Sequence, residues 1–396
     1  MKLKRLALVF FGVVAGLLFS ELGTRVVESN LEKVQLRGAS FGQVETIYDP
    51  KLGLRIAPNA AGHDANGFRN SSIPGHVDIV ALGDSQTWGQ NVRINEAWPQ
   101  KLGQVSGMSI YNMGVNGYGP VEYLALTDQA IKFSPKVIVI GLYFGNDLWD
   151  AYHAVYSRET FQSWRSPELS KSLSADVVSE KANHILEETN RLSEGLRSDS
   201  TPWLFEWLGH HSAIGRVLSD RGHWPGQTAG AKAAALRKAM ERFPDYGVAY
   251  DSGDCHTILT TSYRLQAVDP AEVRIREGLR ITKRALENIH ELATSHQIRL
   301  IVLLLPTKEL VFADRLKSFG RIDSLYGRLI EAETLDRDEL KNYCAAERIE
   351  VVDALPALSA AVASDKQIYP ESGDGHPNSG GYAVIAETLK AGLSNQ

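Results

Sequence analysis

The chain has 396 residues, of which 43% are hydrophobic and 22% are charged, and its formal net charge at pH 7 is −5. This composition excludes a disordered chain and describes a globular protein with one large domain or two modest ones. Because no long basic run follows the first five residues, we expect no nucleic-acid partner.

The amino terminus has the pattern of an export signal. Lys2, Lys4 and Arg5 precede an apolar run over residues 6–19. Fourteen apolar residues are fewer than the ~20 of a comfortable transmembrane helix, but no Ala-x-Ala cleavage site follows. We therefore predict an uncleaved signal anchor over residues 1–22, with a cleaved signal peptide as the alternative and a buried terminal helix as a third reading. Positive charge stays inside, so the rest of the chain would face the periplasm or exterior.

Residues 23–76 carry turn signals and no long periodic run, so we predict an irregular arm. A buried strand is predicted over Val77–Leu82, because five of its six residues are apolar. The strand runs into Gly83-Asp84-Ser85. A serine on a tight turn at the carboxyl end of such a strand exposes its hydroxyl, which makes Ser85 a candidate nucleophile.

Polar groups follow two further predicted strands in the same way. A glycine-rich loop over residues 114–119 follows the second strand, and Gly145-Asn146-Asp147 follows the third. The loop indicates either a close backbone approach or a plain turn. The elements predicted here are a helix over Glu96–Val105, a strand over Ser109–Asn112, a helix over Pro120–Phe133 and a strand over Val137–Leu142.

The alternation stops over residues 148–269, which we interpret as a largely helical insertion. The insertion carries enough aromatic bulk for a small core of its own. It is either a lid with a stacking platform for sugar rings or a subdomain that its tryptophans simply pack. It holds five of the seven tryptophans: Trp149, Trp164, Trp203, Trp207 and Trp224.

Regular alternation returns after the insertion and ends in a short polar loop, Asp374-Gly375-His376-Pro377. Cys255 and Cys344 follow no metal-binding spacing, and a disulfide and two free buried thiols are equally compatible with the sequence. The elements predicted here are helices over Glu272–Ser295, Leu325–Glu347 and Gly380–Leu393 and strands over Arg299–Leu305 and Glu350–Val352.

These residues can be assembled into one kind of chemistry. Nucleophilic acyl transfer needs a hydroxyl, an imidazole that takes its proton, a carboxylate that orients the imidazole, and donors for the developing oxyanion. Ser85, His376 and Asp374 are candidates for the first three roles. The side-chain amide of Asn146 and the backbone N–H of Gly114 are candidate oxyanion donors.

The four blocks that carry these residues, in this order, resemble the SGNH (GDSL-type) hydrolases. The resemblance covers about residues 77–147 and 270–396. It implies an α/β fold, namely a three-layer α/β/α, flavodoxin-like domain with a parallel sheet. It also implies a Ser85, His376 and Asp374 triad and an oxyanion hole formed by Ser85, Gly114 and Asn146.

One spacing departs from the commonest pattern of the family, which has the aspartate three residues before the histidine. Gly373 stands there, and Asp374 comes only two residues before His376. Some exported members of the family, including those similar to exopolysaccharide O-acetylation proteins, resemble this chain in the shorter spacing. The segment Pro306-Thr307-Lys308, after the fourth predicted strand, favours the same exported branch. Glu371, or no acid at all, is the alternative to Asp374.

Four further residues are candidates for substrate contact: Trp88, Tyr118, Trp149 and Lys308. An ordinary surface lysine is the alternative for Lys308. Asp147 is expected to cap or orient its loop. The pair His210-His211 fits two solvated side chains better than a metal site, because adjacent residues of a helix point about 100° apart. We expect no metal and no cofactor.

The sequence therefore predicts a membrane-anchored serine esterase that acts on acyl esters, with an acetyl ester of a glycan as the expected substrate. One alternative is an O-acyltransferase on the same site, in which a sugar hydroxyl replaces water. The other is a glycan-binding scaffold without turnover. Expected partners are an acylated small molecule or glycan, the inner membrane through residues 1–22, and proteins of polysaccharide assembly.

Overall fold

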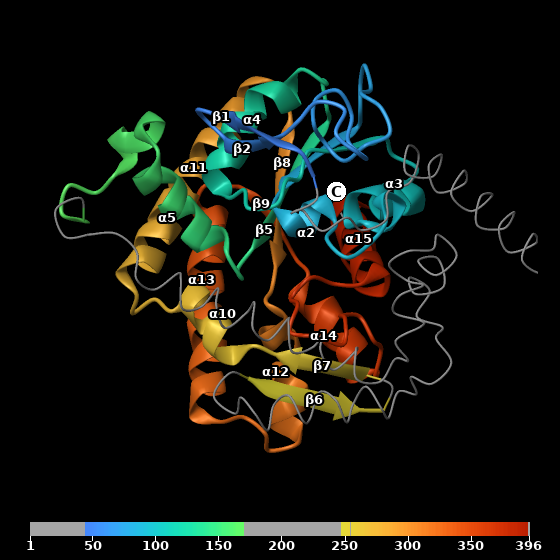
Figure 1. The fold of residues 1–396 in the computed structure, drawn as a ribbon, viewed down its shortest axis with the longest axis vertical. Coiled ribbons are helices and arrows are strands. Elements are labelled where there is room, and N and C mark those ends of the chain that lie inside the picture. The colour runs from blue at the N-terminus through green and yellow to red at the C-terminus, as the bar shows by residue number, and fades with distance from the viewer. Residues whose placement is uncertain (1–43, 170–246, 254, 395–396) are drawn as a thin grey trace, which may run out of the picture.

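The computed structural model describes residues 44–169, 247–253 and 255–394. Its centre is a parallel five-stranded sheet with the strand order β4-β3-β5-β8-β9. In order along the chain this is 2-1-3-4-5, the flavodoxin-like order. Figure 1 labels β5, β8 and β9 of this sheet. The strands are β3 (Ile79–Gly83), β4 (Ile110–Asn112), β5 (Val137–Tyr143), β8 (Arg299–Leu305) and β9 (Glu350–Asp353).

The central strands are apolar along their whole length because both faces of the sheet are covered. In β8, for example, alternate side chains enter two different cores. Leu300, Val302 and Leu304 belong to one core, and Ile301, Leu303 and Leu305 belong to the other.

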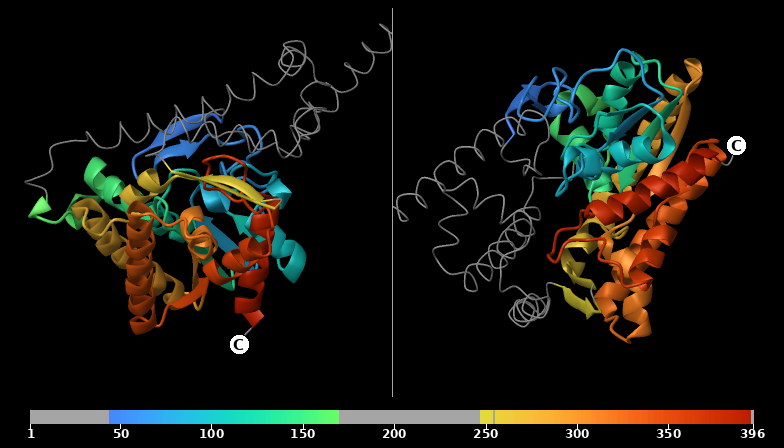
Figure 2. Two further views of the ribbon diagram at one scale, coloured as in Figure 1. Left: turned by 90° about the horizontal axis from the view of Figure 1, so that it is seen from below. Right: turned by 90° about the vertical axis from the view of Figure 1, so that its right-hand side faces the viewer.

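Helices cover both faces of the sheet and complete the predicted three-layer α/β/α fold (Figure 2). On one face pack α4 (Pro120–Ile131), α11 (Val273–Ser295) and α13 (Ser324–Ala346). On the other pack α3 (Trp98–Ser106), α12 (Lys308–Ser318), α14 (Leu355–Ala363) and α15 (Ser379–Ser394). Among the described residues, every predicted strand and helix is present with similar bounds, and α12 and α14 are additions to the prediction.

The predicted arm and insertion contain strands that the sequence pattern did not reveal. In the arm, β1 (Thr46–Asp49) and β2 (Gly53–Ile56) form an antiparallel hairpin. In the insertion, β6 (Val248–Ser252) and β7 (Cys255–Leu259) form a second hairpin, beside α12 and α14 in Figure 1. These strands are short and mix polar with apolar residues, so tertiary packing decides their structure.

The described part of the insertion also contains α5 (Asp147–Ser157), the 3-10 helix η3 (Glu159–Trp164) and α10 (Thr261–Val268). The predictions for residues 1–22, for His210-His211 and for Trp203, Trp207 and Trp224 lie outside the described residues. In the ranges that the structure does describe, we find no helix of the length and apolarity needed to cross a membrane.

The two cysteines are free and buried. Cys255 on β7 packs into the core on the α12 side of the sheet, whereas Cys344 on α13 packs into the opposite core. Of the two readings that the sequence left open, the structure has the two free buried thiols.

Candidate active site

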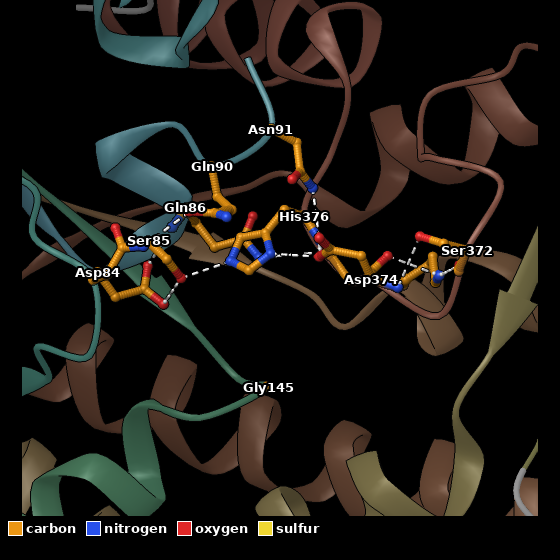
Figure 3. Close-up of polar contacts among 12 residues, drawn as sticks. Asp84, Ser85, Gln86, Gln90, Asn91, Gly145, Ser372, Asp374 and His376 are labelled. Atoms are coloured by element: carbon orange, nitrogen blue, oxygen red, sulfur yellow. Dashed lines mark hydrogen bonds and ion pairs between the residues drawn. The ribbon is translucent and has the colours of Figure 1, made fainter. Parts of the chain in front are cut away.

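The candidate residues meet at the carboxyl edge of the sheet (Figure 3). Ser85 follows β3 at the start of the short helix α2 (Ser85–Trp88), and Asn146 follows β5, the neighbouring strand. Strand order reverses between β3 and β5, and such a switch point is where open α/β sheets bind ligands. The loop before α15 brings Asp374 and His376 to the same place, 289 or more residues further along the chain.

Ser85, His376 and Asp374 form one hydrogen-bonded row (Figure 3). Nε2 of His376 lies 2.7 Å from Oγ of Ser85, and Nδ1 lies 2.5 Å from Oδ1 of Asp374. A carboxylate only accepts, so Nδ1 carries the proton and Nε2 is left as the acceptor for the serine hydroxyl. This is the arrangement in which an imidazole can remove the proton of a serine.

Asp374 reaches the imidazole through a tight turn in spite of its shortened spacing. Its Oδ1 also accepts from the backbone N–H of His376 at 2.9 Å, and its Oδ2 accepts from Nδ2 of Asn91 at 2.6 Å. Burial alone would raise the pKa of Asp374, but the attraction of His376 and these hydrogen bonds hold the pKa well below its usual range. The carboxyl is therefore ionised beside the imidazole at neutral pH.

Two glycines allow α2 to sit close against the strand ends. A Cβ on Gly83 would lie 2.0 Å from Oγ1 of Thr87, and a Cβ on Gly114 would lie 2.5 Å from the backbone nitrogen of Trp88. Asp84 caps the helix by accepting from the backbone N–H of Gln86 at 2.9 Å. The backbone around the nucleophile is thus fixed by packing that only glycine permits.

The three predicted oxyanion donors differ in their availability. Within the described ranges, no acceptor takes the backbone N–H of Ser85. Asn146 donates from Nδ2 to Oδ2 of Asp150 at 2.7 Å. The backbone N–H of Gly114 donates to Oδ1 of Asn112 at 2.9 Å. The prediction of Gly114 as a free donor is therefore corrected, since the side chain of Asn112 satisfies its only N–H.

Buried carboxyl groups surround Asn146 on the protein side. Burial raises the pKa of Asp84, Asp147 and Asp150, and the hydrogen bond from Asn146 partly offsets this rise for Asp84 and Asp150. Asp147 accepts from the backbone N–H of Tyr143 at 2.9 Å and from the hydroxyl of Tyr123 at 3.0 Å. Asp147 therefore orients the loop that carries Asn146, as expected from the sequence.

Trp88 and Tyr118 do not contact substrate, because both side chains are buried. Trp88 is 1% exposed, donates from Nε1 to Nε2 of His63 at 3.0 Å, and has the guanidinium of Arg69 4.0 Å from its ring centre. Tyr118 is 3% exposed. Both residues belong to the core on the α4 side of the sheet, and these two predictions are corrected.

Lys308 is neither a substrate contact nor a surface lysine. It is 0% exposed, at the start of α12 beneath the loop that carries Asp374. Its Nζ donates to Oγ1 of Thr257 at 3.0 Å and to the carbonyl oxygens of Ser372 and Asp374 at 2.8 and 2.9 Å. Both readings of this residue are corrected, since the apolar stem and the ammonium are enclosed by protein.

Trp149 is the predicted contact residue that does face a cavity. The cavity has a volume of about 590 Å³ and begins at Gly145 and Asn146. It runs between α5 and α10 toward the start of α11 and α13. Its further lining residues include Gly117, Trp149, Asp150, Tyr263, Gln266, Asp269, Glu272, Arg274 and Leu325.

Sequence reasoning missed two residues that hold the site loops. Asn91 binds Asp374, as described above, and Arg264 on α10 donates from Nη1 to the carbonyl oxygen of Gly145 at 3.2 Å. A Cβ on Gly375 would lie 2.4 Å from Nη2 of Arg264, so the same guanidinium also lies against the His376 loop. Neither residue belongs to a motif, and only the fold brings them to the site.

No family model and no curated protein matches the sequence. Among solved structures, the chain is similar to a lipolytic protein of the G-D-S-L family from Desulfitobacterium hafniense, with 14% identity over 79% of this chain and 97% of that chain and a TM-score of 0.35. A GDSL-like lipase from Bacteroides thetaiotaomicron has 13% identity over 80% and 86%, with a TM-score of 0.32. An alpha/beta hydrolase enzyme from the metagenome of Lake Arreo has 11% identity over 82% and 99%, with a TM-score of 0.33. The first two structures carry the name of the family that the four sequence blocks resemble.

Proposed function

We propose that this chain is a serine ester hydrolase of the SGNH type. The observation that carries the proposal is the unbroken row from Oγ of Ser85 through the imidazole of His376 to the carboxylate of Asp374, with contacts of 2.7 and 2.5 Å. Asp374 is held in the ionised form that an orienting carboxylate requires.

The proposed reaction has two steps. Oγ of Ser85 attacks the ester carbonyl carbon while Nε2 of His376 takes its proton, and the alcohol leaves with that proton. Water then gives a proton to Nε2 and attacks the acyl-serine, and Nε2 passes that proton to Oγ of Ser85 as the acid is released. Asp374 stays ionised throughout and stabilises the imidazolium that forms in each step.

The developing oxyanion needs donors on the Ser85 side of the sheet. We assign this role to the backbone N–H of Ser85 and to the side-chain amide of Asn146. An amide nitrogen carries two hydrogens, and Asp150 accepts one of them. The second hydrogen, which Asp84 accepts in this structure, would instead be donated to the oxyanion when an ester is bound.

The cavity beside Asn146 supports a sugar as the alcohol part of the ester. Trp149 and Tyr263 supply aromatic surface, and the rest of the lining mixes aliphatic side chains with polar ones such as Gln266. Its ionic groups have partners: Glu272 lies 3.4 Å from Arg274, which also lines the cavity, and Asp269 lies 3.0 Å from Arg328, which does not. Because no cation is left unpaired among these groups, the cavity suits an uncharged sugar better than an anionic one.

The experiment uses the full chain with an acetyl ester, with and without an acetylated neutral oligosaccharide. We expect acetate release, its loss in Ser85→Ala, and covalent labelling of Ser85 by a fluorophosphonate probe. Trp149→Ala should raise KM for the oligosaccharide ester and leave the small ester unaffected. Activity that survives in Ser85→Ala would contradict the proposal, as would a chain that neither hydrolyses esters nor reacts with the probe.

An O-acyltransferase is the second candidate, and the same cavity favours it because it includes Asn146, the assigned oxyanion donor, and has room for an acceptor sugar. The two reactions share their first step and differ in whether water or sugar receives the acyl group. Incubation with an acetyl donor and an unacetylated oligosaccharide separates them. Acetyl-sugar that forms faster than acetate is released would establish the transferase and overturn the hydrolase.

The placement outside the cytoplasmic membrane is also a proposal, and it rests on the basic and apolar residues of 1–22. A phosphatase that is active only outside the cytoplasm, fused after the chain, should be active. The mass of the recovered protein then distinguishes a retained anchor from a cleaved signal. An inactive fusion would contradict export.

A further inference from the structure

The loop that carries the proposed acid and base is held from below by a buried lysine. Lys308 uses all three hydrogens of its ammonium: one goes to the hydroxyl of Thr257, and two go to the carbonyl oxygens of Ser372 and Asp374. The lysine is the first residue of α12, just after β8, and the threonine comes from β7 of the insertion. Two separate elements therefore meet under one short segment.

Thr257 extends this contact along the loop. Its Oγ1 lies 2.9 Å from the carbonyl oxygen of Pro370 and 3.2 Å from that of Ser372. The neighbouring N–H of Ile258 donates to the same carbonyl of Ser372 at 3.3 Å. The backbone just before Asp374 is thus tied to β7 as well as to Lys308.

The contact from Lys308 fixes the backbone carbonyl of Asp374, which the hydrogen bonds of the side chain do not hold. The carboxylate is held by His376 and Asn91, while the carbonyl oxygen of the same residue is held by Lys308. With only Gly375 between acid and base, a small rotation of the Asp374 peptide would move the carboxylate away from Nδ1 of His376. A fixed backbone is therefore required for the short spacing.

Burying a lysine side chain beneath the Asp374 loop costs free energy. An ammonium that is 0% exposed loses its hydration, and burial lowers the pKa of Lys308 to about 8 although Glu309 and Asp374 act to raise it. An apolar side chain would fill the same volume without that cost. The ammonium supplies three directed hydrogen bonds, which an apolar group cannot make.

We propose that Lys308, together with Thr257, is a positioning residue that holds the Asp374 backbone so that the acid meets His376 across the shortened spacing. This inference rests on the proposed function for the role of Asp374. It gives the β6–β7 hairpin a part in the active site. Lys308 touches neither Ser85 nor the imidazole among the contacts described, so it acts through Asp374 alone.

The test compares Lys308→Met and Thr257→Val with a matched control, Thr127→Val. Thr127 is also a buried threonine whose hydroxyl donates to a backbone carbonyl, but it lies within α4. We expect Lys308→Met to lower kcat about 100-fold with KM nearly unchanged. Thr257→Val should lower kcat roughly 3- to 10-fold, as for one net hydrogen bond. Thr127→Val should leave kcat as it is.

A double-mutant comparison shows whether the lysine acts through the acid. In the background of Asp374→Asn, Lys308→Met should cost less than about 3-fold in kcat, because the orienting carboxylate is already lost. An equal loss in both backgrounds would overturn the proposal, and so would a kcat in Lys308→Met that stays within about 3-fold of the wild type.

A second measurement does not depend on activity. The Nδ1–H proton of a histidine bound to a carboxylate gives a separate downfield signal in proton NMR spectra. We expect this signal in the wild type and in Thr127→Val, its loss in Asp374→Asn, and a shifted or broadened signal in Thr257→Val and Lys308→Met. An unchanged signal in Thr257→Val would contradict the positioning role of Thr257 and Lys308 even if Lys308→Met fails to fold. A wild type with this signal but without esterase activity would contradict the proposed function alone.

Discussion

The nitrogen and the oxygen of the Asn146 side-chain amide differ in their hydrogen bonding. Its Nδ2 donates to Asp150, and its Oδ1 is buried without a partner among the described residues. An unpaired buried oxygen costs free energy, so the position of this side chain depends on the bond from Nδ2 to Asp150 and on the constraint of the loop. Asp147, which binds the backbone of the same loop, supplies that constraint.

The first prediction follows from the assigned role of Asn146 in the oxyanion hole. Asn146→Ala should lower kcat for an acetyl ester by about 10²–10³, because one donor to the oxyanion is lost. Steady-state kinetics measure the effect, with the exposed Asn95→Ala as the matched control. A loss of only a few-fold would remove Asn146 from the oxyanion hole.

The second prediction concerns His63, which supports Trp88 beneath the nucleophile. Nδ1 of His63 lies 2.9 Å from the carbonyl oxygen of Ala61, and Nε2 accepts from Trp88. Both contacts suit the neutral ring, and burial lowers the pKa of His63 to about 4. The unfolded chain binds this proton at higher pH, so stability is complete above pH ~6.5 and falls as the pH drops toward 4.

Urea unfolding at pH 7 and at pH 4.5 measures this linkage. Wild type should lose about 2–3 kcal/mol more than His63→Gln between the two conditions, because the variant has no imidazole to protonate. The comparison with the variant cancels the other groups that titrate in this range. Equal losses in the two proteins would show that His63 accepts a proton in the folded state at no cost.

At the scale of elements, the position of α5 decides where Asn146 lies, and α11 decides the position of α5. Gly278 on α11 is buried where the two helices cross, and a Cβ there would lie only 1.8 Å from the carbonyl oxygen of Leu148. The close crossing therefore depends on the missing side chain. In this way α11, which carries no motif, affects the position of the proposed oxyanion donor Asn146.

The third prediction compares two helical glycines. Gly278→Ala should destabilise the protein by roughly 1–3 kcal/mol through overpacking, and it should also lower kcat because α5 moves. Gly327→Ala on α13 should instead stabilise by roughly 0.5–1 kcal/mol, since the nearest atom to its added Cβ is 3.9 Å away. Thermal and urea unfolding measure both. A neutral Gly278→Ala would mean that the helices separate without cost.

At the scale of the whole molecule, the sheet divides the interior into two cores, and each core holds one cysteine. Burial raises the pKa of both thiols to about 11. A buried thiol with a raised pKa reacts slowly, because the thiolate is the reactive form. The two sulfur atoms are also kept apart by the sheet between them.

The fourth prediction is that the folded protein contains two free thiols even after export. A thiol reagent should react slowly with the native chain and with two thiols after unfolding, and reduction should leave the mass unchanged. Cys255→Ser is the control that lowers the count to one. A mass gain of two hydrogens on reduction would establish a disulfide and contradict this arrangement.

The sequence by itself determined the order of strands and helices and the Ser85, His376 and Asp374 candidates, whereas the layered α/β/α fold was implied by the resemblance of the four blocks to a family. Both are local signals: an apolar strand that ends in a polar turn can be found without knowing its neighbours. The bounds of β5, β8, α4 and α11 follow from the same patterns. What local patterns cannot contain is the direction in which a side chain points once the layers close.

The tertiary structure alone decided which of the other candidates reach the site. Trp88, Tyr118 and Lys308 lie beside motif residues in sequence, yet packing encloses all three. Thr257 and Arg264 carry no motif, and they reach the site because the last part of the insertion returns to it. Their contacts join residues far apart in sequence, and such contacts are fixed only when the cores on both faces of the sheet pack together.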